Sequence, residues 1–229
     1  MYVLFTIIEN SLRLFNQVVT KEADVREVFR SNKVLQFEPM VEWGMNCIFA
    51  LSDDGVRALR HDLDGKGDMM LFNQHAFYGN ALKEGPELEK LTLGFCHALY
   101  KLLDKFDEQL SDGAVEVELR DWSSTLIGTA ATTAMLGPAM IERICPDILT
   151  YLWQFEREYF KFIFGLPRWL VPDTYKNREK IIDALEEYSK DPRNLECAVP
   201  MITAREEQMR RAGMKDRDIA ASNFSVLSG

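Results

Sequence analysis

The side chains that could hold a metal ion or act as nucleophiles are few and widely separated in this 229-residue chain. Four cysteines stand far apart and form no Cys-x-x-Cys pair: Cys47, Cys96, Cys145 and Cys197. Structural zinc sites need closely spaced pairs of ligands, so this pattern is not a zinc motif. Three histidines, His61, His75 and His97, share no helical face, so no metal site or catalytic triad is indicated.

Composition narrows the class of protein further. Apolar residues make up 47% and charged residues 28%, which is typical of a globular chain. The 27 basic and 36 acidic residues give a net charge of -9, which argues against a nucleic-acid partner. Four cysteines in a chain of this size do not suggest a disulfide framework and favour a reducing compartment. We find no signal peptide, and no apolar run approaches the roughly 18 residues of a membrane span.

The N-terminal third predicts mixed structure. Residues 2–8 are rich in β-branched and aromatic types, and residues 12–19 alternate after a turn, which together predict a β-hairpin. A helix is expected over residues 21–30, a short one over 40–49 and another over 69–82. Between them, residues 52–55 and 64–68 carry Asp, Gly and Ser and are predicted to break regular structure.

From residue 88 onward the sequence is mostly helical. Apolar residues recur every three or four positions in one stripe: Leu88, Leu91, Phe95, Leu99, Leu102, Phe106 and Leu110. Residues 115–119 read as a short linker or strand. Further helices are predicted over 122–136, 148–163 after an Asp147 cap, 175–189, 198–212 and from 216 onward, with a loop over 165–172. The chain is therefore expected to form a single, mainly α domain with a small N-terminal β-hairpin.

Charged residues near the C-terminus alternate in sign. Five basic residues are interleaved with four acidic ones: Arg205, Arg210, Arg211, Lys215, Arg217, Glu206, Glu207, Asp216 and Asp218. This arrangement predicts a solvated helix surface and not a nucleic-acid patch.

Three segments resemble one family in order along the chain. VTKEADVREVFRSNKVLQFEP (residues 19–39), FGLPRWLVPDTYKNREKIIDAL (164–185) and DIAASNFSVLSG (218–229) resemble successive parts of the N-terminal half of a cytochrome P-450. They are similar to the region leading over the substrate pocket, the pocket roof and the start of the central helix. The likeness is strongest to fungal members of the sterol-hydroxylase and prostacyclin-synthase-like branch. The resemblance implies an incomplete P-450 fold that covers residues 1–229 as one partial domain and ends within the central helix.

The resemblance also implies chemistry. The family binds haem through a cysteine thiolate in a glycine-rich loop and inserts one oxygen atom of O₂ into a hydrophobic substrate, here sterol-like or terpenoid-like. A reductase that uses NADPH supplies the electrons. The cysteine loop is absent from these 229 residues, so we expect the chain alone to be inactive and assign it no catalytic residue and no metal ligand. The family implies the cytoplasmic face of the endoplasmic reticulum membrane, with attachment through segments outside this chain.

The resemblance places several residues near substrate or haem. Trp43, Met45 and Phe49 fall in the segment that covers the pocket, and Phe164 falls near the roof loop, where the apolar side chains could also touch a membrane surface. The central-helix segment contributes Phe224, with Ser228 and Gly229 at the edge of the oxygen groove. His75 falls on a helix beside the haem, where an imidazolium could bind a propionate. Ordinary core packing, or a surface position for His75, remains the alternative for these residues.

Two functions of other classes stay open. A non-enzymatic helical protein, or a pseudogene product, could use exposed apolar faces to bind a partner. The Cys145-Pro146 pair could sense haem, although a cysteine at a helix end followed by a proline in the first turn of the next helix is an ordinary structural pattern.

Overall fold

The computed structural model describes residues 26, 38–63, 65, 79, 81–110 and 113–228. The chain divides into two compact units, residues 1–41 and 42–229, of which the first is described only at Arg26 and 38–41. The predicted β-hairpin over 2–19, most of the helix over 21–30, His75 and Gly229 lie outside the described residues. Of the helix predicted over 69–82, residues 79, 81 and 82 are described, and all three are helical.

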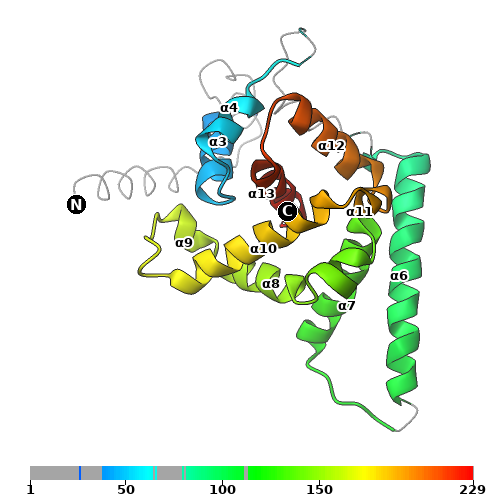
Figure 1. Ribbon diagram of the computed structural model, residues 1–229. Coiled ribbons are helices and arrows are strands. Elements are labelled where there is room, and N and C mark those ends of the chain that lie inside the picture. Colours follow the sequence, from blue (N-terminus) through cyan, green and yellow to red (C-terminus); the bar gives the residue numbers. More distant parts are fainter. Residues whose placement is uncertain are drawn as a thin grey trace. The chain divides into compact units, whose positions relative to one another are not determined.

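Helices make up most of the described chain (Figure 1). Their bounds are α3 (Glu38–Cys47), α4 (Asp53–Leu59), α6 (Pro86–Leu110), α7 (Leu119–Leu136), the π-helix η1 (Met140–Ile144), α8 (Ile148–Glu158), α9 (Phe160–Ile163), α10 (Pro172–Lys190), α11 (Pro192–Glu196), α12 (Pro200–Arg211) and α13 (Asp216–Leu227). The described ranges contain no β-strand, so the prediction of a mainly α fold is confirmed for this part of the chain.

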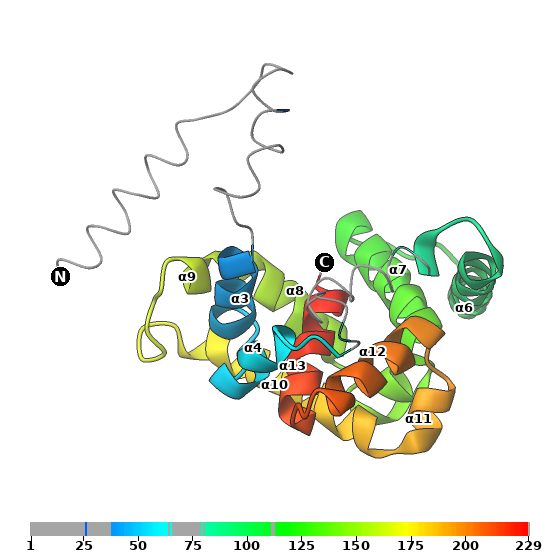
Figure 2. The same ribbon diagram turned by 90° about the horizontal axis from the view of Figure 1, so that it is seen from above.

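Helix α10 organises the packing of the larger unit. It contacts both α8 and α13, and Figures 1 and 2 show it running past these two helices. One face of α10 is fully buried, with Ile181, Ile182, Leu185 and Tyr188 each at most 1% exposed. Leu185 lies four residues after Ile181 and three after Ile182, and Tyr188 lies three after Leu185, which is the spacing of an amphipathic helix facing a core.

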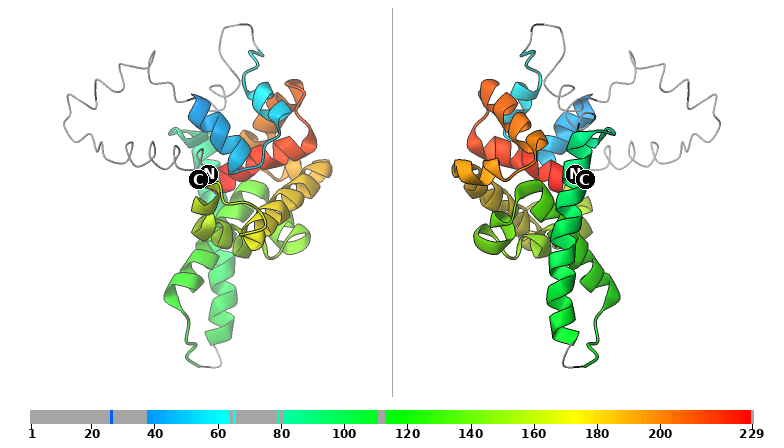
Figure 3. Two further views of the ribbon diagram at one scale, coloured as in Figure 1. Left: turned by 90° about the vertical axis from the view of Figure 1, so that its left-hand side faces the viewer. Right: turned by 90° about the vertical axis from the view of Figure 1, so that its right-hand side faces the viewer.

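Helices α6 and α7 pack along each other, and both views of Figure 3 show them side by side. The residues of the predicted stripe on α6 are half-buried from Leu88 to Phe106, whereas Leu110 is 39% exposed. The rings of Phe106 and Trp122 lie 5.2 Å apart between centroids and join the two helices near one end. The interpretation of 88–110 as one long amphipathic helix is confirmed.

Prolines begin several of the described helices. Pro86, Pro172, Pro192 and Pro200 are each the first residue of a helix. The prediction that Pro172 belongs to a loop was therefore wrong, and the short α11 was not predicted. Proline suits the first helical position because the N–H that it lacks has no intrahelical acceptor there.

Two further element predictions need correction. Residues 52–55 were expected to break structure, but Ser52 is the N-cap of α4, and its Oγ accepts a hydrogen bond from the N–H of Gly55 at 3.1 Å. Two acidic residues in the first turn suit the positive end of the helix dipole. The helix predicted over 148–163 is interrupted by a turn at Tyr159, and Asp147 occupies the N-cap of α8 without a side-chain capping bond.

The prediction of a solvated charged surface over residues 205–218 was wrong for three residues. Arg205, Glu206 and Asp218 are 1%, 2% and 5% exposed. Each is held by polar partners from other helices or from the segment before α4, which is how a charged side chain is tolerated inside a protein.

Candidate functional site

An aromatic cluster joins distant parts of the larger unit. The ring of Phe224 in α13 lies 4.7 Å from that of Phe155 in α8 and 5.3 Å from that of Phe49, measured between centroids. Phe162 in α9 extends the cluster, 5.8 Å from Phe155 and 4.8 Å from Tyr175 in α10. Tilted and edge-to-face contacts at these separations are favourable beyond the apolar area that they bury.

A buried arginine closes one end of this cluster. The guanidinium of Arg178 lies 4.5 Å from the ring centroid of Phe162 and 4.9 Å from that of Tyr175. Its Nη1 donates to the carbonyl oxygens of Cys47 at 2.9 Å and Ile48 at 3.4 Å, which are acceptors left open at the end of α3. Burial lowers the pKa of Arg178, and the neighbouring Glu179 opposes that shift. Arg178 thus ties the end of α3 to α9 and α10.

The sequence-predicted pocket residues fall into two groups. Phe49 and Phe224 meet in the aromatic cluster, and Phe224 has no exposed surface. Met45 is buried at 8% exposure, whereas Trp43 and Phe164 are 45% and 60% exposed. The ring centroids of Phe164 and Phe160 lie 6.4 Å apart. The structure therefore brings together Phe49 and Phe224, while Trp43 and Phe164 face outward.

An apolar cavity is bounded by α7, α8 and the end of α13. Its volume is about 380 Å³, and its lining includes Ile127, Met135, Leu152, Val226 and Leu227. Ser228 follows these α13 residues directly, and its Oγ is buried without a hydrogen-bond partner in the described part of the chain. The small residues of α7, Gly128 and Ala131 among them, were the available sequence signal for this cavity.

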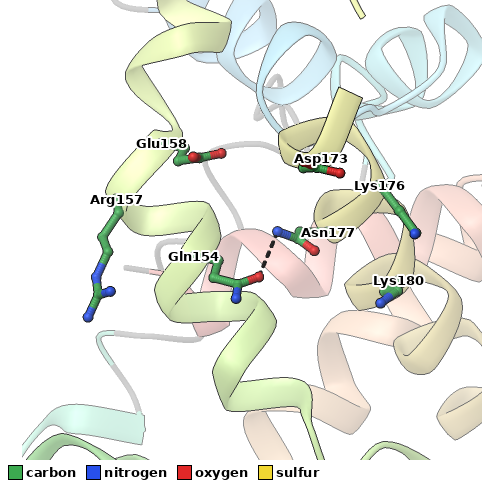
Figure 4. Close-up of a pocket in the computed structure, with 7 residues that line it drawn as sticks. All are labelled: Gln154, Arg157, Glu158, Asp173, Lys176, Asn177 and Lys180. Carbon is green, nitrogen blue, oxygen red and sulfur yellow. Dashed lines mark hydrogen bonds between the residues drawn. The ribbon is translucent and has the colours of Figure 1, made fainter. Parts of the chain in front are cut away.

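A second cavity, between α8 and α10, is polar (Figure 4). It has a volume of about 460 Å³, and the Nδ2 of Asn177 donates to the Oε1 of Gln154 across it at 2.8 Å. Three basic and two acidic residues complete the lining: Arg157, Lys176, Lys180, Glu158 and Asp173. Figure 4 shows Arg157 extending away from α10. The charged side chains of this lining are of both signs, so they do not indicate one class of ligand or reaction.

Sequence reasoning missed a buried polar network between α10, α12 and α13. The Oε1 of Glu206 accepts hydrogen bonds from the Oγ of Ser189 and the Nδ2 of Asn223, both at 2.8 Å. The Nη2 of Arg205 donates to the Oγ of Ser222 at 3.1 Å. The small polar residues Ser222 and Asn223 on an otherwise apolar helix were the available signal. These contacts fix the relative positions of three helices and perform no reaction by themselves.

Burial disfavours the thiolate form of two of the four cysteines. Burial raises the pKa of Cys47, whose Sγ donates to the carbonyl oxygen of Phe162 at 3.4 Å, and burial also raises the pKa of Cys145. Cys96 lies within α6, and Cys197 lies after α11 beside Gly137. Within the described ranges, no three or more His, Cys, Asp or Glu side chains gather into a metal-binding group. Among the helices described, none is long and apolar enough to span a membrane.

Comparison with known proteins finds one relative that bears on function. The chain is similar to the cytochrome P450 monooxygenase calL of Penicillium decumbens, with 26% identity over 119 residues. The match covers 52% of this chain and 22% of that protein. The matched region thus spans about a fifth of the relative's length. No family model matches the chain, and no solved structure matches it significantly.

Proposed function

We propose that this chain is part of a haem-dependent monooxygenase of the cytochrome P-450 family. The observation that carries the proposal is the similarity to a fungal P450 monooxygenase over 119 residues. The helical architecture of the described residues is consistent with it. The reaction would join one oxygen atom of O₂ to a carbon of the substrate and release the other as water. Two electrons, delivered by a reductase that draws on NADPH, and two protons complete the balance.

None of the four cysteines lies in a glycine-rich loop like the one that holds the haem ligand of such an enzyme. Burial also disfavours the free thiolate of Cys47 and of Cys145. Cys96 lies inside a helix, without a glycine-rich loop around it. When bound, haem with an axial thiolate supplies the cleavage of the O–O bond.

The part that we assign to this chain is the shaping of an apolar substrate site. Phe49, Phe155, Phe162 and Phe224 come from four separate segments and meet in the aromatic cluster, and of these four Phe49 alone is partly exposed. Apolar surroundings with few polar groups suit a sterol-like or terpenoid-like molecule, which binds mainly by burial of carbon surface. Ser228 and Gly229 are proposed to lie beside the bound oxygen, and His75 is proposed to contact haem.

The decisive experiment starts from the native transcript. The protein that it encodes should be produced with haem, reduced and exposed to carbon monoxide. We expect the red-shifted difference band that marks thiolate-ligated haem, and NADPH-dependent hydroxylation of ergosterol or a terpenoid when a reductase is added. A transcript-encoded protein that binds haem without this band would contradict the proposal.

We propose that the complete protein lies at the cytoplasmic face of the endoplasmic reticulum membrane. One surface feature of this chain supports that location. Residues 159–170 carry a group of exposed apolar side chains, which we call the apolar patch: Tyr159, Phe160, Ile163, Phe164, Trp169 and Leu170. Lys161 and Arg168 lie within the same segment. Aromatic residues combined with basic ones are typical of protein surfaces that contact anionic lipids. The same patch favours the second candidate function, binding of a partner protein by a non-enzymatic chain.

A further inference from the structure

A cleft between α7 and α8 has polar walls, and the functions proposed above make no use of it. Its volume is about 630 Å³, and its lining comes from residues 120–125 at the start of α7 and 150–157 of α8. A cleft of this size can hold a small molecule of one or two rings. Five of its nine lining side chains carry neutral hydrogen-bonding groups: Ser124, Thr125, Thr150, Trp153 and Gln154. These neutral groups, more than the charged ones, indicate the class of ligand.

The hydroxyl groups of this cleft are free to bind a ligand. Those of Ser124, Thr125 and Thr150 make no hydrogen bond to another group in the described part of the chain. They come from two helices, and each can both donate and accept a hydrogen bond. The side-chain NH₂ of Gln154 is available as well, because the bond with Asn177 uses only the Oε1 of Gln154. The two walls therefore present donors and acceptors to the same space.

The indole of Trp153 adds a buried donor without an acceptor. Its Nε1 is shielded from water and makes no hydrogen bond within the described ranges. A buried N–H that lacks an acceptor is unfavourable, so such a group in a folded protein calls for a partner. Gly128 of α7 lets the ring lie close, because a Cβ at that position would be 2.9 Å from the Cζ2 of Trp153. Trp153 lines the cleft, so an acceptor on a bound molecule would complete this bond.

The charges of the lining favour a neutral ligand. Two basic and two acidic side chains complete it: Arg120, Arg157, Asp121 and Glu156. The Nη2 of Arg157 lies 3.8 Å from the Oδ1 of Asp121, so one opposite pair already joins the two helices. Glu156 makes no ion pair with the described residues, and partial burial raises the pKa of its carboxyl group. Because the lining has no net charge, it gives a strongly anionic or cationic molecule little electrostatic attraction.

We propose that this cleft binds a neutral carbohydrate of one or two sugar rings. Sugar hydroxyl groups both donate and accept hydrogen bonds, which matches the hydroxyl groups of Ser124, Thr125 and Thr150. One sugar oxygen accepts from the Nε1 of Trp153, and two adjacent hydroxyl groups donate to the carboxylate of Glu156. This inference does not depend on the monooxygenase proposal, because the cleft and the aromatic cluster have no residue in common.

The test follows the indole N–H signals of the four tryptophans by NMR while maltose is added to the isotope-labelled 229-residue chain. We expect the signal of Trp153, identified by its loss in Trp153→Phe, to shift and to saturate. Thr150→Val keeps the shape of the side chain and removes one hydroxyl group, which should weaken maltose binding about three- to tenfold. Thr92→Val is the matched control in α6, where the Oγ1 of Thr92 donates to the carbonyl of Leu88, and should leave the affinity unchanged.

A second variant and a second ligand make the outcome decisive. Thr125→Val removes a hydroxyl group from the opposite wall and should also weaken maltose binding, so a folding defect in one variant, seen by circular dichroism, does not decide the result. A Trp153 signal that does not saturate with maltose or glucose would mean that the cleft holds only water. That result, unchanged affinity in both threonine variants, or saturation by sodium sulfate at a lower concentration than by maltose would each overturn the proposal.

Discussion

The carboxylate of Asp218 accepts two hydrogen bonds from Ser52, a residue 166 positions earlier in the chain. Its Oδ1 lies 2.7 Å from the backbone nitrogen of Ser52, and its Oδ2 lies 2.8 Å from the hydroxyl oxygen. Because Ser52 also caps α4, one carboxylate in the first turn of α13 fixes where α4 begins. Asp218 is 5% exposed, so the contact is shielded from competing water.

Gly55→Ala should destabilise the protein, against the usual trend for helices. Alanine is favoured over glycine in a helix by about 1 kcal/mol. At Gly55, however, a Cβ would lie 2.8 Å from both Cγ and Oδ1 of Asp218. The resulting displacement should cost about 1–3 kcal/mol in the free energy of unfolding, measured by urea denaturation.

Gly94→Ala is the matched control for that substitution. Gly94 also lies within a helix, and the nearest atom to a new Cβ would be the Cβ of Ala134 at 3.9 Å. This variant should be more stable than the parent by about 0.5–1 kcal/mol. If both variants gained stability, the close approach of Asp218 to α4 would be refuted.

Asp218→Asn tests the charge of the same contact. Asparagine keeps the shape of the side chain, but one of its two positions becomes an NH₂ group that faces the donors of Ser52. The free energy of unfolding should fall by about 1–3 kcal/mol because a buried donor loses its acceptor. Asp183→Asn removes an exposed partner of Arg217 and should change stability by less than about 1 kcal/mol. Equal losses of stability for Asp218→Asn and Asp183→Asn would argue against a buried contact between Asp218 and Ser52.

The sequence predicted the long amphipathic elements because burial of one helical face dictates their pattern. The stripe on α6 is the clearest case, and the start of α13 at Asp216 was predicted from its acidic first turn and apolar spacing. Helix starts at Pro172 and Pro192 were missed because a proline signals either a loop or a first turn, and only neighbouring structure decides between them.

The buried charges could not be predicted for a related reason. A sequence gives the sign of Arg205, Glu206 and Asp218 but not their partners, and each partner belongs to another segment. Alternating charge on a helix usually means exposure to solvent. The meeting of Phe49 with Phe224 is likewise a contact between distant segments. The resemblance to a family placed each residue near a substrate pocket but did not predict that their rings meet.

Tyr188→Phe should lower stability near neutral pH and change its dependence on alkaline pH. The hydroxyl of Tyr188 lies 2.7 Å from the carbonyl oxygen of Leu136 and 2.8 Å from that of Asn194, so its loss should cost about 1–2 kcal/mol. Burial raises the pKa of Tyr188 above its usual value, which means that the folded protein keeps this proton while the unfolded chain loses it near pH 10.

The stabilisation from Tyr188 is therefore fully present below about pH 10 and is lost as the pH rises toward the folded-state pKa. Urea denaturation at several pH values should show the advantage of the parent over Tyr188→Phe shrinking by up to about 1.4 kcal/mol per pH unit above pH 10. Tyr100→Phe, at a residue 67% exposed, should show no such difference. If the parent stayed more stable than Tyr188→Phe by the same amount at every pH above 10, Tyr188 would not be buried in its protonated form.

Phe49→Ala should weaken binding of an apolar substrate if the aromatic cluster forms part of the substrate site. In the haem-loaded protein encoded by the native transcript, we expect the affinity for ergosterol, followed by the haem absorption change, to fall about tenfold for one lost aromatic contact surface. Trp43→Ala, at a residue 45% exposed, should change that affinity by less than about twofold. If both variants lost affinity for ergosterol equally, or lost it in proportion to their loss of folding stability, Phe49 would be a core residue that does not contact substrate.

Trp169→Ser should reduce attachment to lipid vesicles if the apolar patch contacts a membrane. Trp169 is 80% exposed, and transfer of one large apolar side chain into lipid contributes about 1.5–3 kcal/mol, so vesicle affinity should fall about tenfold or more. The measurement is co-sedimentation with vesicles of phosphatidylcholine and phosphatidylserine, and added salt should also weaken binding because Lys161 and Arg168 contribute charge. Tyr100→Ser, at a comparably exposed residue of α6, should leave attachment unchanged. Vesicle binding that is equal for both variants would assign attachment to another part of the protein and leave the patch to a protein partner.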